Sequence, residues 1–128
     1  MPVRCLIVDD NRDFLRAASD LLERDGITVV GVASTGARAR HACLELRPDV
    51  VLLDIQLGEE TGFEVARQLV DKPGPDKPRV ILISSYSRED FGDMVADTQA
   101  PSFLPKSALS ATAVLGILAS PGEAVSGR

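Results

Sequence analysis

The chain has 128 residues, 45% of them hydrophobic and 26% charged, which is typical of one ordinary globular domain. Its formal net charge of −5 argues against a general nucleic-acid binder, because such proteins meet the phosphate backbone with a basic face. No stretch approaches the roughly 20 apolar residues of a membrane helix, and no targeting segment is recognisable, so we expect a cytoplasmic protein without membrane contact.

Five apolar runs rich in β-branched residues recur along the chain and predict five strands. They lie at residues 3–8, 27–32, 49–53, 79–83 and 102–104. Most of these runs are continuous rather than alternating, which is typical of strands that are covered on both faces in a parallel sheet.

Helical patterns follow each of these strands. They cover residues 11–26, 35–48, 61–70, 87–99 and 107–120. The first has one apolar stripe that includes Phe14, Leu15 and Leu22, and Gly26 is a plausible C-terminal cap. The fourth pattern is weaker, because Gly92 lies inside it.

The alternation of strands and helices predicts an α/β fold of the (βα)5 type. We expect a doubly wound, five-stranded parallel sheet with the flavodoxin-like strand order 2-1-3-4-5. The domain should span residues 1–120. Residues 121–128 read as a flexible tail or a stub of linker.

The two cysteines and the single histidine give little sign of chemistry. Cys5 lies in the first apolar run and Cys43 in a helical pattern, and no metal-binding spacing connects them, so both are predicted to be buried, reduced thiols. His41 lacks a second histidine for a catalytic pair and is expected on a solvated helix face.

Polar side chains stand at the ends of the predicted strands, where open parallel sheets bind ligands. Asp9 and Asp10 follow the first strand, Asp54 the third and Ser84 the fourth, while Lys106 lies near the end of the fifth. The strand order 2-1-3-4-5 makes the first and third strands neighbours, so the three carboxylates should share one crevice.

Three carboxylates in one crevice require compensating positive charge. Each close pair costs about 4 kcal/mol at about 4 Å and an effective dielectric constant near 20. Lys106 supplies one positive charge, and a divalent cation would supply two more. Because the candidate ligands are oxygen atoms only, they favour Mg²⁺.

Four sequence motifs resemble the receiver domain of two-component response regulators. They are "VDDN" after the first strand, "LLDIQLGEETGFEVA" around Asp54, "ILISS" at the fourth strand and "FLPK" at the fifth. Together, in this order and at strand ends, they make the resemblance specific, and it covers essentially residues 3–119.

The resemblance implies a phosphorylation-activated signalling switch rather than a turnover enzyme. Asp54 would accept a phosphoryl group from a sensor histidine kinase, a phosphotransfer protein or a small phosphodonor. Asp10, Asp54 and the backbone carbonyl of Gln56 would bind Mg²⁺, and Asp9 would assist through water. Lys106 would pair with the phosphoryl oxygens.

The resemblance also implies residues that transmit and time the signal. Ser84 would hydrogen-bond the phosphoryl group, and Phe103 would turn inward as an aromatic switch. Gln56 and Tyr86 occupy the two positions that tune how fast phosphate is lost in the family. The signal would leave through the fourth helix, the fifth strand and the fifth helix.

The chain departs from the usual family pattern at three places. Gly58 stands where a proline is common after the acceptor, Ser102 replaces a glycine before the aromatic switch, and Ser107 replaces a proline after the lysine. None of these changes removes a reactive group, but they leave the geometry of the loops after the third and fifth strands open.

Alternatives remain for individual residues and for the whole chain. Asp9 could cap the helix that follows it. Residues 107–122 carry no charge, so the last helix could contact a second copy or an effector. The chain could be part of a longer DNA-binding regulator, or a Mg²⁺-dependent aspartyl-phosphate phosphatase of the haloacid dehalogenase type, although two aspartates at that class's spacing are missing.

Overall fold

The computed structural model of the chain describes residues 3–70, 78–85 and 102–119. The predicted fourth helix at 87–99, most of the proline-rich segment at 71–78 and the proposed tail at 121–128 lie outside these residues. Within them, the predicted parallel sheet is confirmed.

Five parallel strands form the sheet in the order β2-β1-β3-β6-β7, which is the predicted order 2-1-3-4-5. Their bounds are β1 Arg4–Val8, β2 Thr28–Ala33, β3 Val50–Asp54, β6 Arg79–Ser84 and β7 Ser102–Pro105. A small antiparallel hairpin, which the sequence patterns did not predict, follows β3. It consists of β4 (Gln56–Leu57) and β5 (Glu60–Thr61).

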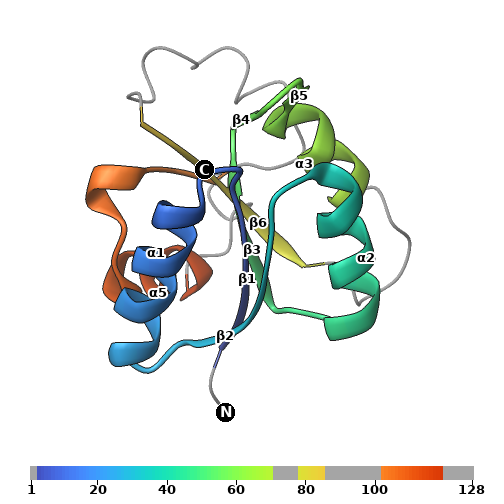
Figure 1. Cartoon of the computed structure of the whole chain (residues 1–128). Helices are drawn as coiled ribbons and strands as arrows, with labels where there is room; N and C mark the ends of the chain where they lie inside the picture. The colour runs from blue at the N-terminus through green and yellow to red at the C-terminus, as the bar shows by residue number, and fades with distance from the viewer. Residues whose placement is uncertain (1–2, 71–77, 86–101, 120–128) are drawn as a thin grey trace, which may run out of the picture.

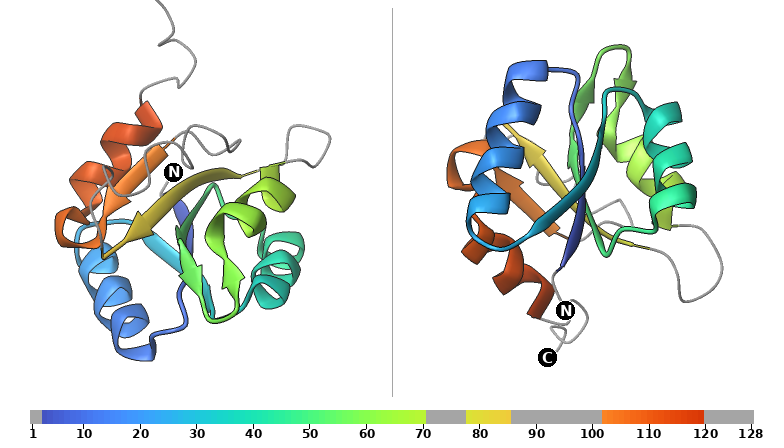
Figure 2. Two further views of the ribbon diagram at one scale, coloured as in Figure 1. Left: turned by 90° about the horizontal axis from the view of Figure 1, so that it is seen from above. Right: turned by 60° about the horizontal axis from the view of Figure 1, so that its bottom comes forward.

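Helices cover both faces of the sheet (Figures 1 and 2). Helices α1 (Arg12–Arg24) and α5 (Ala111–Ala119) lie on one face, and α2 (Gly36–Leu46) and α3 (Gly62–Val70) lie on the other. The order of strands and helices along the chain is that of a doubly wound fold.

Burial on both faces explains why the strand sequences are continuously apolar. In β1, Leu6 and Val8 pack in the core under α2 and α3, whereas Cys5 and Ile7 pack in the core under α1 and α5. Successive side chains of a strand point to opposite faces, so a strand between two helical layers needs apolar residues at every position.

The edge strand β2 is the exception to this prediction. Its residues are mostly half-buried or exposed, and Val32 is 50% exposed. The strand pairs only with β1 among the described strands, and the helices on the two faces leave part of it uncovered. Its apolar residues therefore fit the strand prediction but do not all contribute to the core.

Side-chain caps set the starts of the helices. Asn11 accepts hydrogen bonds from the backbone N–H groups of Asp13 and Phe14 and caps α1, and Thr35 caps α2. The alternative that Asp9 caps α1 is therefore wrong.

The last helix is shorter than predicted. A 3₁₀ turn, η2 (Lys106–Ala108), precedes it, and the hydroxyl of Ser110 accepts a hydrogen bond from the N–H of Ala113, so α5 begins at Ala111.

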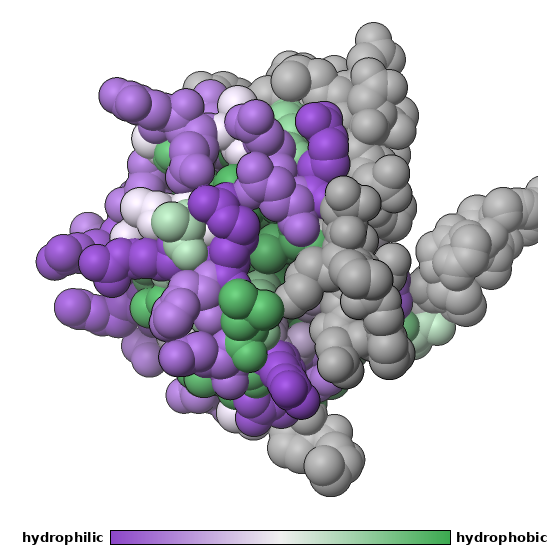
Figure 3. Space-filling view, turned by 90° about the vertical axis from the view of Figure 1, so that its right-hand side faces the viewer, coloured by the Kyte–Doolittle hydropathy of each residue, from purple (hydrophilic) through white to green (hydrophobic). Residues whose placement is uncertain are grey.

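The predictions for the cysteines and the histidine are confirmed. Both cysteines are buried and are not joined in a disulfide, and burial raises the pKa of the Cys5 thiol to about 12. His41 is exposed on α2 and pairs with Glu45 one turn later. On the side of the molecule that carries α2 and α3, hydrophilic residues cover much of the described surface, with smaller hydrophobic groups between them (Figure 3).

Candidate functional site

Acidic side chains meet at the carboxyl-terminal edge of the sheet, as the sequence predicts. One carboxylate oxygen from each of Asp9, Asp10 and Asp54 lies within 4.8 Å of the others. These residues line a cavity of ≈ 540 Å³, to which Ser84 and Lys106 also contribute. The structure therefore brings together the end of β1, the end of β3, the end of β6 and the residue after β7.

Asp9 is fully buried and has two different partners. Its Oδ1 accepts a hydrogen bond from the N–H of Asn11 at 2.9 Å. Its Oδ2 lies 2.6 Å from the ammonium nitrogen of Lys106, but it accepts no hydrogen bond of good geometry from the described residues. The contact is an ion pair, so Lys106 offsets part of the negative charge of Asp9.

Asp10 is exposed and is held by the loop after β3. Its Oδ2 accepts a hydrogen bond from the N–H of Gly58 at 3.1 Å. Gly58 has φ of 61°, a left-handed conformation that proline cannot adopt. The glycine that departs from the family pattern thus supplies both this turn and a donor that proline lacks.

Asp54 ends β3 and is buried, and its surroundings change its acidity. Burial raises the pKa of its carboxyl group to about 6, and the nearby charges of Asp9 and Asp10 act in the same direction. The ammonium group of Lys106 and a hydrogen bond from the backbone of Gln56 oppose this rise. Asp54 therefore remains mostly ionised at neutral pH.

Lys106 lies between the carboxylates. Its ammonium nitrogen is 3.7 Å from Oδ2 of Asp54, farther than from Asp9, and 4.4 Å from the ring centroid of Phe14. The contact with the ring is a cation–π interaction. From the sequence, Phe14 was predicted only as part of the apolar stripe of the first helix, because a stripe residue gives no sign that its ring borders a site.

The hairpin beside the site depends on a second glycine, Gly62. A Cβ atom at this position would lie 2.1 Å from the backbone oxygen of Asp54. The preceding Glu60 accepts a hydrogen bond from the N–H of Gly36 at 2.8 Å and so ties the hairpin to the start of α2. Neither residue was predicted to support the site, since only the tertiary structure brings these backbones together.

The remaining predicted site residues are only partly described. Ser84 is buried at the end of β6, and Phe103 is half-buried on β7, packed against the core under α2 and α3. Gln56 is exposed in β4 and lines the acidic cavity. Tyr86 lies outside the described residues.

The residues at this site fit a hard divalent cation. Three carboxylates each place one oxygen atom within 4.8 Å of the others, and no histidine or cysteine joins this cluster among the described residues. An oxygen-only donor set of this kind suits Mg²⁺, which usually keeps several waters and binds few protein ligands.

A family model described as the response regulator receiver domain matches residues 5–115. The chain belongs to this family. It is thus a receiver domain of the two-component type, a phosphoacceptor module that acts as a signalling switch, as the sequence motifs predicted.

Solved structures support the fold of this receiver domain. The signal receiver domain of the response regulator NarL from Mycobacterium tuberculosis has a TM-score of 0.82 and 28% identity, with 94% of this chain and 98% of that one covered. The response regulator domain of CheB from Thermotoga maritima has a TM-score of 0.74 and 26% identity, with coverage of 93% and 95%.

Longer curated proteins contain similar sequences. A protein-glutamate methylesterase/protein-glutamine glutaminase of Halobacterium salinarum is 35% identical over 86 residues, 66% of this chain and 24% of that protein. The uncharacterized transcriptional regulatory protein YvfU of Bacillus subtilis is 33% identical over 105 residues, 81% of this chain and 52% of that protein. The chain thus spans about a quarter to a half of these relatives.

The helices give no sign of membrane insertion. Among the residues that the structure describes, no helix is both long enough and apolar enough to cross a bilayer.

Proposed function

We propose that Asp54 is the residue that accepts the phosphoryl group. The observation that carries this proposal is the position of its buried carboxylate. One of its oxygens lies within 4.8 Å of a carboxylate oxygen of Asp9 and of Asp10, and its Oδ2 lies 3.7 Å from the ammonium nitrogen of Lys106. An anionic nucleophile can approach an anionic phosphorus only where positive charge offsets the repulsion.

Asp10 and Asp54 would hold Mg²⁺ together with the backbone carbonyl of Gln56, and Asp9 would assist through water. The bound ion would neutralise charge on the phosphodonor and orient it. An ionised oxygen of Asp54 attacks phosphorus, the bond to the donor's leaving group breaks, and an aspartyl phosphate remains. Lys106 lies close enough to Asp54 to pair with an oxygen of the new phosphoryl group.

The phosphoryl group would then act on neighbouring residues. The Ser84 hydroxyl lines the same cavity and would donate a hydrogen bond to it. Phe103 lies half-buried on the adjacent strand β7, and it would turn inward as Ser84 shifts. Gln56 and Tyr86 would tune the lifetime of the phosphoryl group.

The expected partners are a sensor histidine kinase or a phosphotransfer protein in the cytoplasm. We infer that the receiver domain acts as a switch that gains and loses its own phosphoryl group, rather than as an enzyme with turnover on other substrates. Methylesterase and transcriptional activities are named for its relatives. This domain would control such an activity in another domain or protein and would not perform it itself.

Intact mass spectrometry tests the proposal. Incubation with acetyl phosphate and Mg²⁺ should add one phosphoryl group, and a chelator should prevent the addition. Asp54→Asn should abolish it, whereas Asp20→Asn, which changes an exposed aspartate on α1, should not. Phosphorylation of Asp54→Asn to the wild-type extent, or steady hydrolysis of phosphate esters by that variant, would refute the assignment.

A further inference from the structure

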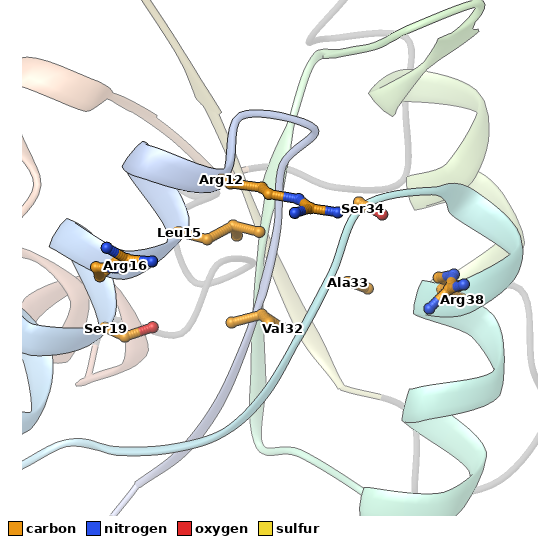
Figure 4. A pocket seen from close by; sticks show the side chains of 8 residues that line it. All are labelled: Arg12, Leu15, Arg16, Ser19, Val32, Ala33, Ser34 and Arg38. Carbon is orange, nitrogen blue, oxygen red and sulfur yellow. The ribbon is translucent and has the colours of Figure 1, made fainter.

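A second cavity, of ≈ 390 Å³, lies beside the edge strand β2, between α1 and α2 (Figure 4). It shares no lining residue with the acidic cavity. Its lining includes three arginines, Arg12, Arg16 and Arg38, and no carboxylate from the residues that the structure describes. The chain as a whole has a net charge of −5, whereas the charged residues that line this groove are all positive.

The fold itself does not explain these arginines. None of the three guanidinium groups forms an ion pair or a hydrogen bond within the described part of the chain. Arg12 and Arg38 also lie in the first turns of α1 and α2, where the helix dipole disfavours a cation. All three residues are exposed, so they are available to a ligand.

The floor of the groove is apolar. Leu15 of α1 and Val32 and Ala33 of β2 form it, and Val32 is one of three large hydrophobic residues exposed on the described surface. Because β2 is an edge strand, the outer side of its backbone has no partner strand among those described. At the start of β2, the N–H of Val29 donates a hydrogen bond to the Glu23 carboxylate. Val32 lies farther along the strand, within the groove.

The arrangement of the three arginines indicates the shape of the ligand. In Figure 4, Arg12 extends from α1 toward Ser34, Arg16 lies farther along α1, and Arg38 stands on the opposite wall. Cations on both walls with an apolar floor between them suit an elongated ligand with several carboxylates better than one compact anion.

We propose that this groove docks an extended acidic segment of a partner protein alongside β2. Aliphatic side chains of the segment cover Val32 and Leu15, and its carboxylates pair with the arginines, whose planar guanidinium groups match carboxylates in bidentate geometry. The docking mode is the addition of a strand to an exposed sheet edge. It goes beyond the phosphoacceptor switch, because it uses a separate surface and does not require Asp54.

Nuclear magnetic resonance of the ¹⁵N-labelled, unphosphorylated domain tests this proposal. The probe is a synthetic peptide with the repeat Glu-Glu-Val-Val, which presents both residue types on each face of a strand, and its analogue with glutamine in place of glutamate is the control ligand. The glutamate peptide should shift amides of residues 12–19 and 32–38 saturably. Arg16→Glu with Arg38→Glu should weaken binding by about tenfold or more.

The control protein carries Arg24→Glu with Arg67→Glu, the same charge change at exposed positions outside the groove. It should bind the peptide as the wild type does. Equal loss in both double variants, equal binding of the glutamine peptide, or no saturable shifts in the wild type would overturn the proposal. So would displacement of the peptide by an equal concentration of citrate, which would indicate a small-anion site.

Discussion

At the scale of single residues, Asp54 links the chemistry of the site to the stability of the fold. The folded state raises the pKa of this carboxyl group from 3.8 to about 6, so the folded state binds the proton more tightly than the unfolded chain does. The group therefore costs no stability at pH below 3.8, and its ionisation destabilises the fold increasingly as the pH rises through about 6.

Replacement of Asp54 by Asn should remove this cost. We expect the free energy of unfolding at pH 7.5, without Mg²⁺, to rise by about 1–3 kcal/mol, and the difference from wild type to vanish near pH 3.5. Urea denaturation at several pH values measures it. Mg²⁺ should reduce the difference in the free energy of unfolding between the variant and the wild type, because it stabilises the ionised wild type. A variant less stable than wild type at pH 7.5 would show that this carboxylate is not destabilising.

Gly62 tests how tightly the loop after β3 packs against the phosphoacceptor. In Gly62→Ala, the new Cβ would lie 2.1 Å from the backbone oxygen of Asp54, so the backbone must move. We expect a loss of about 2 kcal/mol or more in stability. Gly116→Ala in α5 is the matched control, because nothing lies within 4 Å of its Cβ. This control should gain roughly 0.5–1 kcal/mol, and a neutral Gly62→Ala would contradict the packing described.

At the scale of secondary-structure elements, the β4–β5 hairpin is coupled to helix α2. This helix has no acidic residue of its own in its first turn, and the Glu60 carboxylate accepts a hydrogen bond from the N–H of its first residue, Gly36. A negative charge at this end of a helix is favourable. The hairpin therefore supplies an N-terminal interaction that the helix sequence lacks.

Removal of this carboxylate should be measurable. Glu60→Ala should lower the free energy of unfolding by about 1 kcal/mol, and less at high salt, because the interaction is partly electrostatic. Glu59→Ala changes the neighbouring exposed residue and should stay within about 0.5 kcal/mol of wild type. Equal effects from the two substitutions in thermal or chemical denaturation would mean that the Glu60 contact contributes nothing specific.

The elements show what could be predicted from sequence and what could not. Apolar runs predicted all five strands of the main sheet, and the residues at their ends predicted the acidic site, because burial and strand polarity are local signals. The hairpin after β3 was not predicted, because strands of two residues each are too short to show a periodicity. The sequence also did not predict the roles of Gly58, Glu60 and Phe14, because each of them contacts a residue that is distant in sequence.

At the scale of the whole molecule, the question is which surface passes the signal on. The uncharged last helix suggested an apolar outer face, but the structure buries Ala111 and Val114 and half-buries Ile117 and Leu118. Leu115, 41% exposed, is the large apolar side chain that α5 still presents to solvent within the described residues. A self-association surface on this helix would therefore centre on Leu115.

Light scattering with and without beryllofluoride, which mimics the phosphoryl group, tests such association. If α5 mediates dimers, beryllofluoride should raise the molar mass of the wild type toward twice the monomer, and Leu115→Glu should keep it monomeric. Because Leu115 is exposed, this substitution should leave folding intact. A wild type that stays monomeric in both conditions would rule out dimerisation through this helix.

Chemical mapping of the modified residue tests most directly whether the carboxylate of Asp54 forms the acyl phosphate. The domain would be phosphorylated with acetyl phosphate and Mg²⁺, reduced with borohydride, digested and sequenced by mass spectrometry. An aspartyl phosphate is reduced to homoserine, whereas an unmodified aspartate is not. We predict homoserine at position 54. Homoserine at position 9 or 10 instead, or at no position in a protein that has gained a phosphoryl group, would show that Asp54 is not the phosphoacceptor.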